Sequence, residues 1–119
     1  MILIVDDDPI FLERAKEILN QQRRVVFASN SQQAFHLAQD IGFSVVLVNL
    51  HLRSDDGLKL IGVIHEKVRG LPIIALNDSP HSAIVKVAKH LGAIEVLNKP
   101  ITLEWKPVVE RVRATANRS

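Results

Sequence analysis

Residues 45–57 have the sequence VVLVNLHLRSDDG, in which an unbroken apolar run passes into a polar loop at Asn49. A continuous apolar run of this length is typical of a parallel strand that is buried on both faces. In open parallel sheets, ligands bind outside the carboxyl ends of the strands. Asn49 therefore lies where a reactive side chain is expected, but its neutral amide is a poor nucleophile.

The same alternation of apolar runs and amphipathic segments extends along the whole chain. The apolar runs predict strands at residues 2–5, 24–28, 44–48, 72–76 and 94–97. The amphipathic segments predict helices at about residues 9–20, 31–42, 57–69 and 80–91. In the last of these, the residues expected to face the core are Ile84, Val87, Ala88 and Leu91.

The final helix has two possible starts. Thr102 is a plausible N-cap, but Pro107 would then lie inside the helix and remove a hydrogen bond to Leu103. The alternative, which we favour, is a helix that begins near Lys106 with Pro107 at its first position. Val108, Val109 and Val112 then face the core.

Five strands that alternate with five helices predict an α/β fold, a doubly wound parallel sheet with right-handed crossovers and helices on both faces. The 119 residues, 47% of them hydrophobic, are expected to form a single domain over residues 1–119. The absence of cysteine excludes disulfides and thiol catalysis and is consistent with a cytoplasmic location. A net charge of +2 gives little reason to expect nucleic-acid binding, and no apolar run approaches the roughly 20 residues that span a bilayer.

Polar residues follow four of the predicted strands, and parallel topology brings them to one edge of the sheet. They are Asp6, Asp7 and Asp8, then Asn49, then Asn77 and Asp78, then Lys99 and Pro100. Asp8 followed by Pro9 also fits a helix N-cap with proline at the first helical position.

Several short motifs together resemble the receiver domain of two-component response regulators, over essentially the whole chain. They are ILIVDDD (residues 2–8), the step from Asn49 to Gly57 through DDG, GLPIIAL (70–76), LGAIEVL (91–97) and NKP (98–100). The resemblance implies a flavodoxin-like five-stranded sheet with strand order 2-1-3-4-5.

The resemblance also implies roles for individual positions. In such domains Asp6 and Asp7 would help to hold magnesium, with the metal positions falling at Asp7, Asn49 and the backbone carbonyl of His51. The position of Asn49 normally carries an aspartate that accepts a phosphoryl group from a histidine kinase.

Two further positions belong to the expected switch, and a third is the expected pocket lysine. The position of Asn77 normally carries Thr or Ser, and that of Val96 normally carries Tyr or Phe. Lys99 matches the lysine that contacts the phosphoryl oxygens, and its bond to Pro100 is expected to be cis.

This chain departs from the pattern at the positions that accept and report the phosphoryl group. Asn49 cannot form an aspartyl phosphate, Asn77 lacks a hydroxyl, and Val96 has no ring. An engineered exchange of Asp for Asn would explain Asn49 alone, so natural degeneracy is the favoured interpretation. We expect Lys99 to contact Asp7 or Asp6 and close the pocket, with no required cofactor and at most weak magnesium binding.

The predicted function is therefore that of a pseudo-receiver, a protein-interaction module without enzymatic activity. The expected partners are a histidine kinase, an output domain or a second copy, without nucleic acid or membrane. The expected surface is the fourth helix, fifth strand and fifth helix, including Lys86, Lys89, Trp105 and Lys106. For Trp105, packing against its own domain is the favoured role, and the interaction surface is the alternative.

One functional alternative remains open, a working receiver that uses a different acceptor. Asp55 and Asp56 are the candidates, although Asp56 before Gly57 is typical of a turn that opens a helix.

Overall fold

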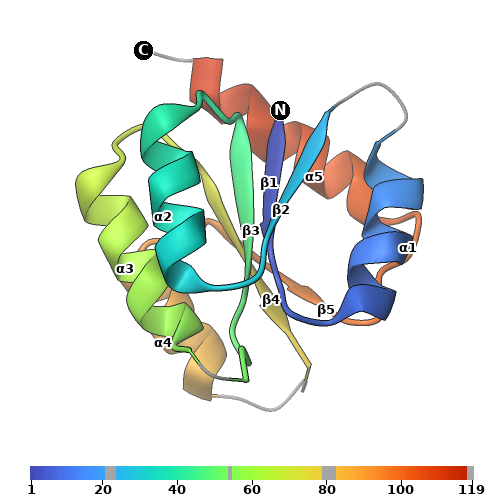
Figure 1. Cartoon of the computed structure of the whole chain (residues 1–119), viewed down its shortest axis with the longest axis horizontal. Coiled ribbons are helices and arrows are strands. Elements are labelled where there is room, and N and C mark those ends of the chain that lie inside the picture. Colours follow the sequence, from blue (N-terminus) through green and yellow to red (C-terminus); the bar gives the residue numbers. More distant parts are fainter. Residues whose placement is uncertain (21–23, 54, 79–82, 118–119) are drawn as a thin grey trace.

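Five parallel strands form one sheet in the order β2-β1-β3-β4-β5 (Figure 1). The strands are β1 (Ile2–Val5), β2 (Val25–Ala28), β3 (Val45–Asn49), β4 (Ile73–Asn77) and β5 (Glu95–Asn98). This computed structural model describes residues 1–20, 24–53, 55–78 and 83–117. The strand order confirms the predicted doubly wound topology.

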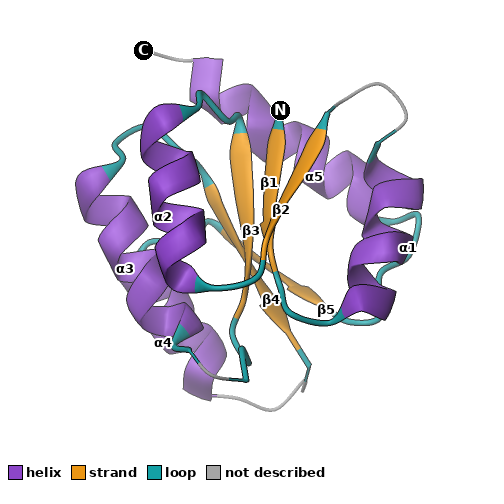
Figure 2. Ribbon diagram, viewed as in Figure 1, coloured by secondary structure: helices purple, strands orange, loops and turns teal. Residues whose placement is uncertain are grey.

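Helices cover both faces of the sheet (Figure 2). They are α1 (Pro9–Leu19), α2 (Ser31–Asp40), α3 (Gly57–Lys67), α4 (Ala83–Leu91) and α5 (Trp105–Arg113), with a short 3-10 helix at Ala114–Asn117. The helices α1 and α5 share one core with the sheet, and α2, α3 and α4 share the other. The layers are those of a three-layer α/β sandwich.

The three central strands supply both cores, because successive side chains of a strand point to opposite faces. Along β1, Ile2 and Ile4 pack on the α1 and α5 side, whereas Leu3 and Val5 pack on the other. All residues of β1, β3 and β4 are buried, whereas the edge strands β2 and β5 are mostly half-buried. The continuous apolar runs therefore correspond to strands that are buried on both faces.

Side-chain caps begin three of the helices at the carboxyl ends of the strands. Asp8 accepts a hydrogen bond from the Ile10 N–H at 3.0 Å and is followed by Pro9, as the sequence predicts. Asn30 and Asp56 cap α2 and α3 by accepting from backbone N–H groups three residues further on. Each cap satisfies a backbone donor that the helix itself leaves unpaired.

Three strand ends differ from the prediction by one residue. Asn49, Asn77 and Asn98 are the last residues of β3, β4 and β5, whereas the predicted strands ended one residue earlier. Asn77 pairs in register with Asn98, and Asn49 pairs with Leu76. A polar side chain does not end a parallel ladder, because the backbone groups make the hydrogen bonds.

Two predictions about helices are wrong in detail. Pro107 is the third helical residue of α5, which begins at Trp105, and not the first as predicted. Its missing N–H is harmless there because the first N–H groups of a helix have no partner within it.

Val87 of α4 was predicted to face the core, but it is 44% exposed, whereas Ala88 is fully buried. The predicted start of this helix at residue 80 lies outside the described residues.

The glycines of α3 give a prediction about stability. A Cβ on Gly62 would meet the Leu91 Cδ2 at 3.6 Å, an ordinary contact. Gly62→Ala should therefore raise the free energy of unfolding by about 0.5–1 kcal/mol, because alanine loses less backbone entropy in a helix. Urea unfolding monitored by circular dichroism measures this change.

Gly57→Ala is the matched comparison, because the new Cβ would overlap the backbone oxygen of Asn49. This variant should be clearly less stable than the parent. Equal effects of the two substitutions would contradict the packing described here.

Candidate functional site

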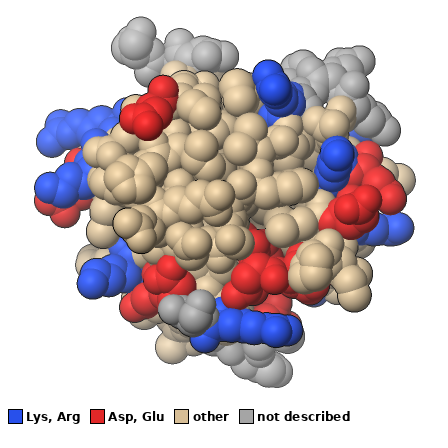
Figure 3. Space-filling model, in the orientation of Figure 1, with Lys and Arg blue, Asp and Glu red and all other residues tan. Residues whose placement is uncertain are grey.

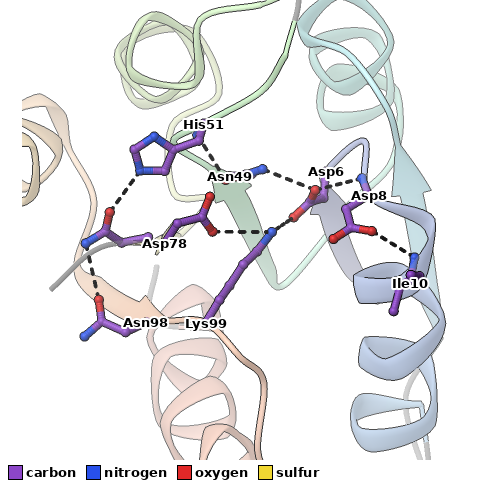
Figure 4. Close-up of polar contacts among 9 residues, drawn as sticks. Asp6, Asp8, Ile10, Asn49, His51, Asp78, Asn98 and Lys99 are labelled. Carbon is purple, nitrogen blue, oxygen red and sulfur yellow. Dashed lines mark hydrogen bonds and ion pairs between the residues drawn. The ribbon is translucent and has the colours of Figure 1, made fainter.

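Acidic side chains gather at the end of the molecule where β1 and β3 finish, in the lower half of the face shown in Figure 3. Four of the predicted site residues meet at this edge of the sheet. Asp6 and Lys99 follow β1 and β5, and Asn49 and Asn77 end β3 and β4. Figure 4 shows how the side chains of Asp6, Asn49 and Lys99 point toward one another.

Asp6 is the centre of this cluster, and its side chain is completely buried. Its Oδ1 accepts hydrogen bonds from the Asp8 N–H at 3.0 Å and from the Asn49 Nδ2 at 3.2 Å. Its Oδ2 lies 2.7 Å from the Lys99 Nζ, an ion pair whose angles are not those of a well-aligned hydrogen bond. Of the two predicted partners of Lys99, the structure therefore selects Asp6 and not Asp7.

Lys99 is held by groups on three sides. Its side chain is 15% exposed, and its ammonium group lies 3.9 Å from the Asp78 Oδ1. The same ammonium lies 4.2 Å from the centre of the Phe11 ring, within range of a cation–π interaction. The Lys99–Pro100 peptide bond is cis, as the resemblance implied.

Asn49 uses both halves of its amide and is 3% exposed. Its Nδ2 donates to Asp6, and its Oδ1 accepts from the His51 N–H at 3.0 Å. An aspartate in this place would bring a second buried carboxylate against Asp6, and two like charges at this distance are destabilising unless a cation lies between them. The amide is therefore the group that fits a closed pocket without a metal.

A hydrogen-bonded chain links the ends of β4 and β5 to the loop after β3. The Asn77 Oδ1 lies 3.0 Å from the His51 Nε2, and the Asn77 Nδ2 donates to the Asn98 Oδ1 at 3.3 Å. The sequence predicted a role only for the backbone carbonyl of His51, so its ring and Asn98 are additions. The signal for Asn98 was its position at the end of a strand, beside Asn77. Val96 is half-buried and packs against the core on the α3 side.

The expected magnesium ligands have other partners in this arrangement. Asp7 accepts the Arg53 N–H at 2.8 Å, and the Asn49 oxygen accepts the His51 N–H. Both oxygens of Asp6 are taken by N–H donors or by Lys99. Magnesium requires several oxygen ligands at close to octahedral geometry. The residues as arranged do not fit a magnesium ion.

The residues predicted for the interaction surface do not all lie at the surface. Lys86 and Lys89 are exposed on α4, and Lys106 is half-buried. Trp105 is only 5% exposed and packs against Phe11, with 5.9 Å between ring centres. Trp105 is thus a core residue, as the favoured interpretation predicted, and it is removed from the expected interaction surface.

The two candidate substitute acceptors have structural partners. Asp56 is the N-cap of α3, and Asp55 accepts the Ser31 N–H at 2.6 Å across the loop to α2. This hydrogen bond from the Ser31 backbone holds the pKa of Asp55 below its ordinary value of 3.8, with help from its bond to the Asp56 N–H and from the charge of Lys59.

This fold, with an acidic residue, an amide and a lysine at the carboxyl ends of three strands, defines a doubly wound α/β domain of the receiver class. The family described as "Response regulator receiver domain" matches residues 2–106. The chain therefore belongs to the response regulator receiver domain family. No helix among the described residues has the length and apolar character needed to cross a membrane.

Two relatives illustrate that this chain matches part of longer proteins. The two-component response regulator ARR2 of Arabidopsis thaliana is 31% identical over 94% of this chain and 18% of its own length. The transcriptional regulatory protein MalR of Bacillus subtilis is 26% identical over 87% of this chain and 45% of its own. The chain thus spans less than half of the length of these relatives.

Solved structures show the same fold. The receiver domain of NtrX from Brucella abortus matches the full length of both chains with a TM-score of 0.87 at 21% identity. The receiver domain of an HD domain-containing protein from Pseudomonas fluorescens has a TM-score of 0.89 at 24% identity, over 97% of this chain and 87% of its own.

Breaking the central ion pair tests its structural role. Lys99→Met should lower the free energy of unfolding by about 3 kcal/mol, because it leaves the buried Asp6 carboxylate without its cation. The double variant Asp6→Asn with Lys99→Met should recover much of this loss. Urea unfolding gives each value.

The exposed Lys16 on α1 provides the control, since Lys16→Met should change stability by less than about 0.5 kcal/mol. A loss below about 1 kcal/mol for Lys99→Met would contradict the described role.

The lowered pKa of Asp55 predicts a pH-dependent contribution to stability. The ionised form makes the favourable bond, so its stabilisation is present above the ordinary pKa of 3.8 and is lost as the pH falls through the lowered value. Asp55→Asn should therefore reduce stability at pH 7 by less than about 1 kcal/mol, since the group is exposed, and have little effect near pH 3. Unfolding curves from pH 3 to pH 7 measure it.

The control is Asp40→Asn, which removes a carboxylate from the exposed last residue of α2, where no described N–H group binds it. If Asp55→Asn and Asp40→Asn lose equal stability at every pH from 3 to 7, the stabilising role of the Ser31 hydrogen bond is refuted.

Proposed function

We propose that this domain is an atypical receiver of a two-component pathway that does not accept a phosphoryl group at the usual position. In this proposal it acts as a protein-interaction module and not as an enzyme. The observation that carries the proposal is the amide of Asn49, which occupies the acceptor position and is hydrogen-bonded on both sides. An amide nitrogen has a delocalised lone pair and the amide oxygen does not form an acyl phosphate, so the group supplies no usable nucleophile.

The surrounding pocket supports the same proposal. Lys99, the lysine expected to contact phosphoryl oxygens, is paired with Asp6 at 2.7 Å. The Asp6 side chain of this pair is completely buried. A phosphoryl group entering the pocket would have to compete with a charge partner that is already in place. We therefore propose that the resting pocket is closed by its own residues and requires no metal cofactor.

Loss of the usual switch chemistry is a second line of support. Asn77 carries an amide, engaged with His51 and Asn98, where the family has a hydroxyl. Val96 has no aromatic ring to move between positions. The position that accepts the phosphoryl group and the positions that respond to it are therefore all altered in this chain.

The proposed contacts with other proteins use the α4-β5-α5 side of the domain. Lys86 and Lys89 are exposed there, and Val87 and Ile94 are 44% and 49% exposed. Exposed apolar side chains among charged ones are typical of protein interfaces. The partner would be a histidine kinase, an output domain or a second copy, in the cytoplasm, without nucleic acid or membrane.

The decisive experiment is incubation with acetyl phosphate and magnesium, followed by intact-mass spectrometry. The parent protein should show no gain of a phosphoryl group, because no carboxylate stands at position 49. Asn49→Asp should gain one phosphoryl group, and only when magnesium is added. This comparison shows whether Asn49 is the cause of the inactivity.

A phosphoryl gain by the parent protein would overturn the proposal in favour of a different acceptor. The variants Asp55→Asn and Asp56→Asn then identify which carboxylate accepts the group. Loss of the gain in one of them and not in the other would assign the acceptor.

A further inference from the structure

A groove of about 790 Å³ lies between α3 and α4, which pack side by side (Figure 1). Apolar side chains from Val63, Leu71 and Leu91 line it, and Gly62 contributes no side chain. The polar side chains that line it are all exposed; they are Lys59, Arg69, Glu66, His65 and His90. The groove therefore combines an apolar part with a rim that has two cations against one carboxylate.

The two helices that form the groove carry a net positive charge, whereas the rest of the domain carries a net negative charge. Residues 57–70 and 83–91 hold five Lys and Arg residues against one carboxylate, Glu66, a formal charge of +4. The whole chain carries +2, so the remainder carries −2. The five cations are Lys59, Lys67, Arg69, Lys86 and Lys89.

These five cations form no close ion pair within the described part of the domain, although the charge of Lys59 acts on Asp55 at longer range. None of them forms an ion pair with another residue among residues 1–20, 24–53, 55–78 and 83–117. By contrast, Lys99, Arg111 and Arg113 each pair with a carboxylate at 2.7 Å. Arg14, Lys16, Arg24 and Arg53 also form no ion pair among the described residues, but they lie outside α3 and α4. The distinction of the groove is therefore that five such cations lie on or directly beside the two helices that border it.

We propose that the α3–α4 groove binds an acidic amphipathic peptide segment of a partner protein. Apolar side chains of the peptide would enter the groove beside Val63 and Leu91, while its carboxylates would lie against Lys59 and Arg69. Such a segment matches both features of the surface, because amphipathic peptides use apolar anchors for affinity and charges for orientation.

The same features favour a peptide over nucleic acid. Nucleic-acid surfaces rely on contacts to phosphates and, for single strands, on aromatic side chains that stack against bases. Phe, Trp and Tyr are absent from the described residues that line this groove, and its apolar part is aliphatic. Lys59 and Arg69 are able to contact phosphates, but the aliphatic part offers bases no surface for stacking and favours apolar side chains.

The groove also lies apart from the pocket around Asp6. None of the described residues that line it is a hydrogen-bond or ion-pair partner of Asp6, Asn49 or Lys99. The groove and the pocket therefore share no lining residue, although Leu58 and Lys59 lie at the start of α3, the end of the helix that packs against Asn49. The inference goes beyond the proposed function and does not depend on whether Asn49 accepts phosphate.

The test uses the full chain and a fluorescein-labelled peptide of about 15 residues, long enough to lie along α3. The peptide carries Leu at helical i, i+3 and i+4 spacing and Glu elsewhere. Fluorescence anisotropy should show binding that weakens as salt is raised. A peptide with Lys in place of every Glu should bind at least about tenfold more weakly, because the rim is cationic.

Two sets of variants locate the site. Lys59→Glu with Arg69→Glu should weaken binding at least about tenfold. The matched control is Arg14→Glu with Lys16→Glu, which changes the net charge equally on exposed residues of α1 and should alter affinity less than about twofold. Gly62→Leu should also weaken binding by filling the groove, whereas Gly62→Ala should not. Circular dichroism confirms that each variant is folded.

Several results would overturn the inference. These are no binding at millimolar protein, equal losses in the α1 control, or equal binding of the lysine peptide. Displacement of the peptide by a DNA duplex at lower concentration would assign the surface to nucleic acid instead. A salt-sensitive dimer abolished by Lys59→Glu with Arg69→Glu would assign it to a second copy.

Discussion

A buried carboxylate at the end of the first strand imposes the main constraint on this domain. Asp6 is fully enclosed, and a charge in that position must be matched by a cation and by hydrogen-bond donors. Lys99, at the end of β5, supplies the cation across two intervening strands, while Asp8 and Asn49 supply N–H groups. The local structure at three strand ends is thus tied to one carboxylate, which explains why the loops there are held by side chains that lie far apart in sequence.

Three neutral amide side chains supply most of the remaining hydrogen bonds of the pocket. Asn49, Asn77 and Asn98 stand at the ends of three adjacent strands, and each can donate and accept at the same time. Asn49 donates to Asp6, and Asn77 donates to Asn98 while its oxygen meets the His51 ring. A site built from carboxylates needs an added cation to hold like charges together. In a site built from amides and one ion pair, the polar groups are partners for one another and no added cation is needed. This is the physical basis for proposing that the pocket is closed.

The periodic pattern of the chain was enough to predict the fold, because buried parallel strands and amphipathic helices leave strong signals. It also brought Asp6, Asn49, Asn77 and Lys99 to one edge of the sheet, since parallel topology fixes where strand ends lie. It could not choose between Asp6 and Asp7 as the partner of Lys99, because that depends on which carboxylate points inward. The inward place given to Val87 was wrong, and the sequence left two roles open for Trp105, of which the favoured one, packing in the core, is found. Both placements depend on how one helix packs, which spacing alone does not determine.

The distribution of charge suggests how such a domain can still discriminate between partners. The ion pair of the pocket is internal, so its charges contribute little to long-range attraction of another protein. The cations beside the α3–α4 groove are unpaired and solvated, so they attract an anionic partner without first breaking an internal contact. The charges of the pocket are thus neutralised by the ion pair between Asp6 and Lys99, whereas those of the α3 and α4 cations are not neutralised by ion pairs among the described residues. In the proposed binding mode, specificity for a partner would be carried by this exposed surface, whose charge does not depend on chemistry at Asn49.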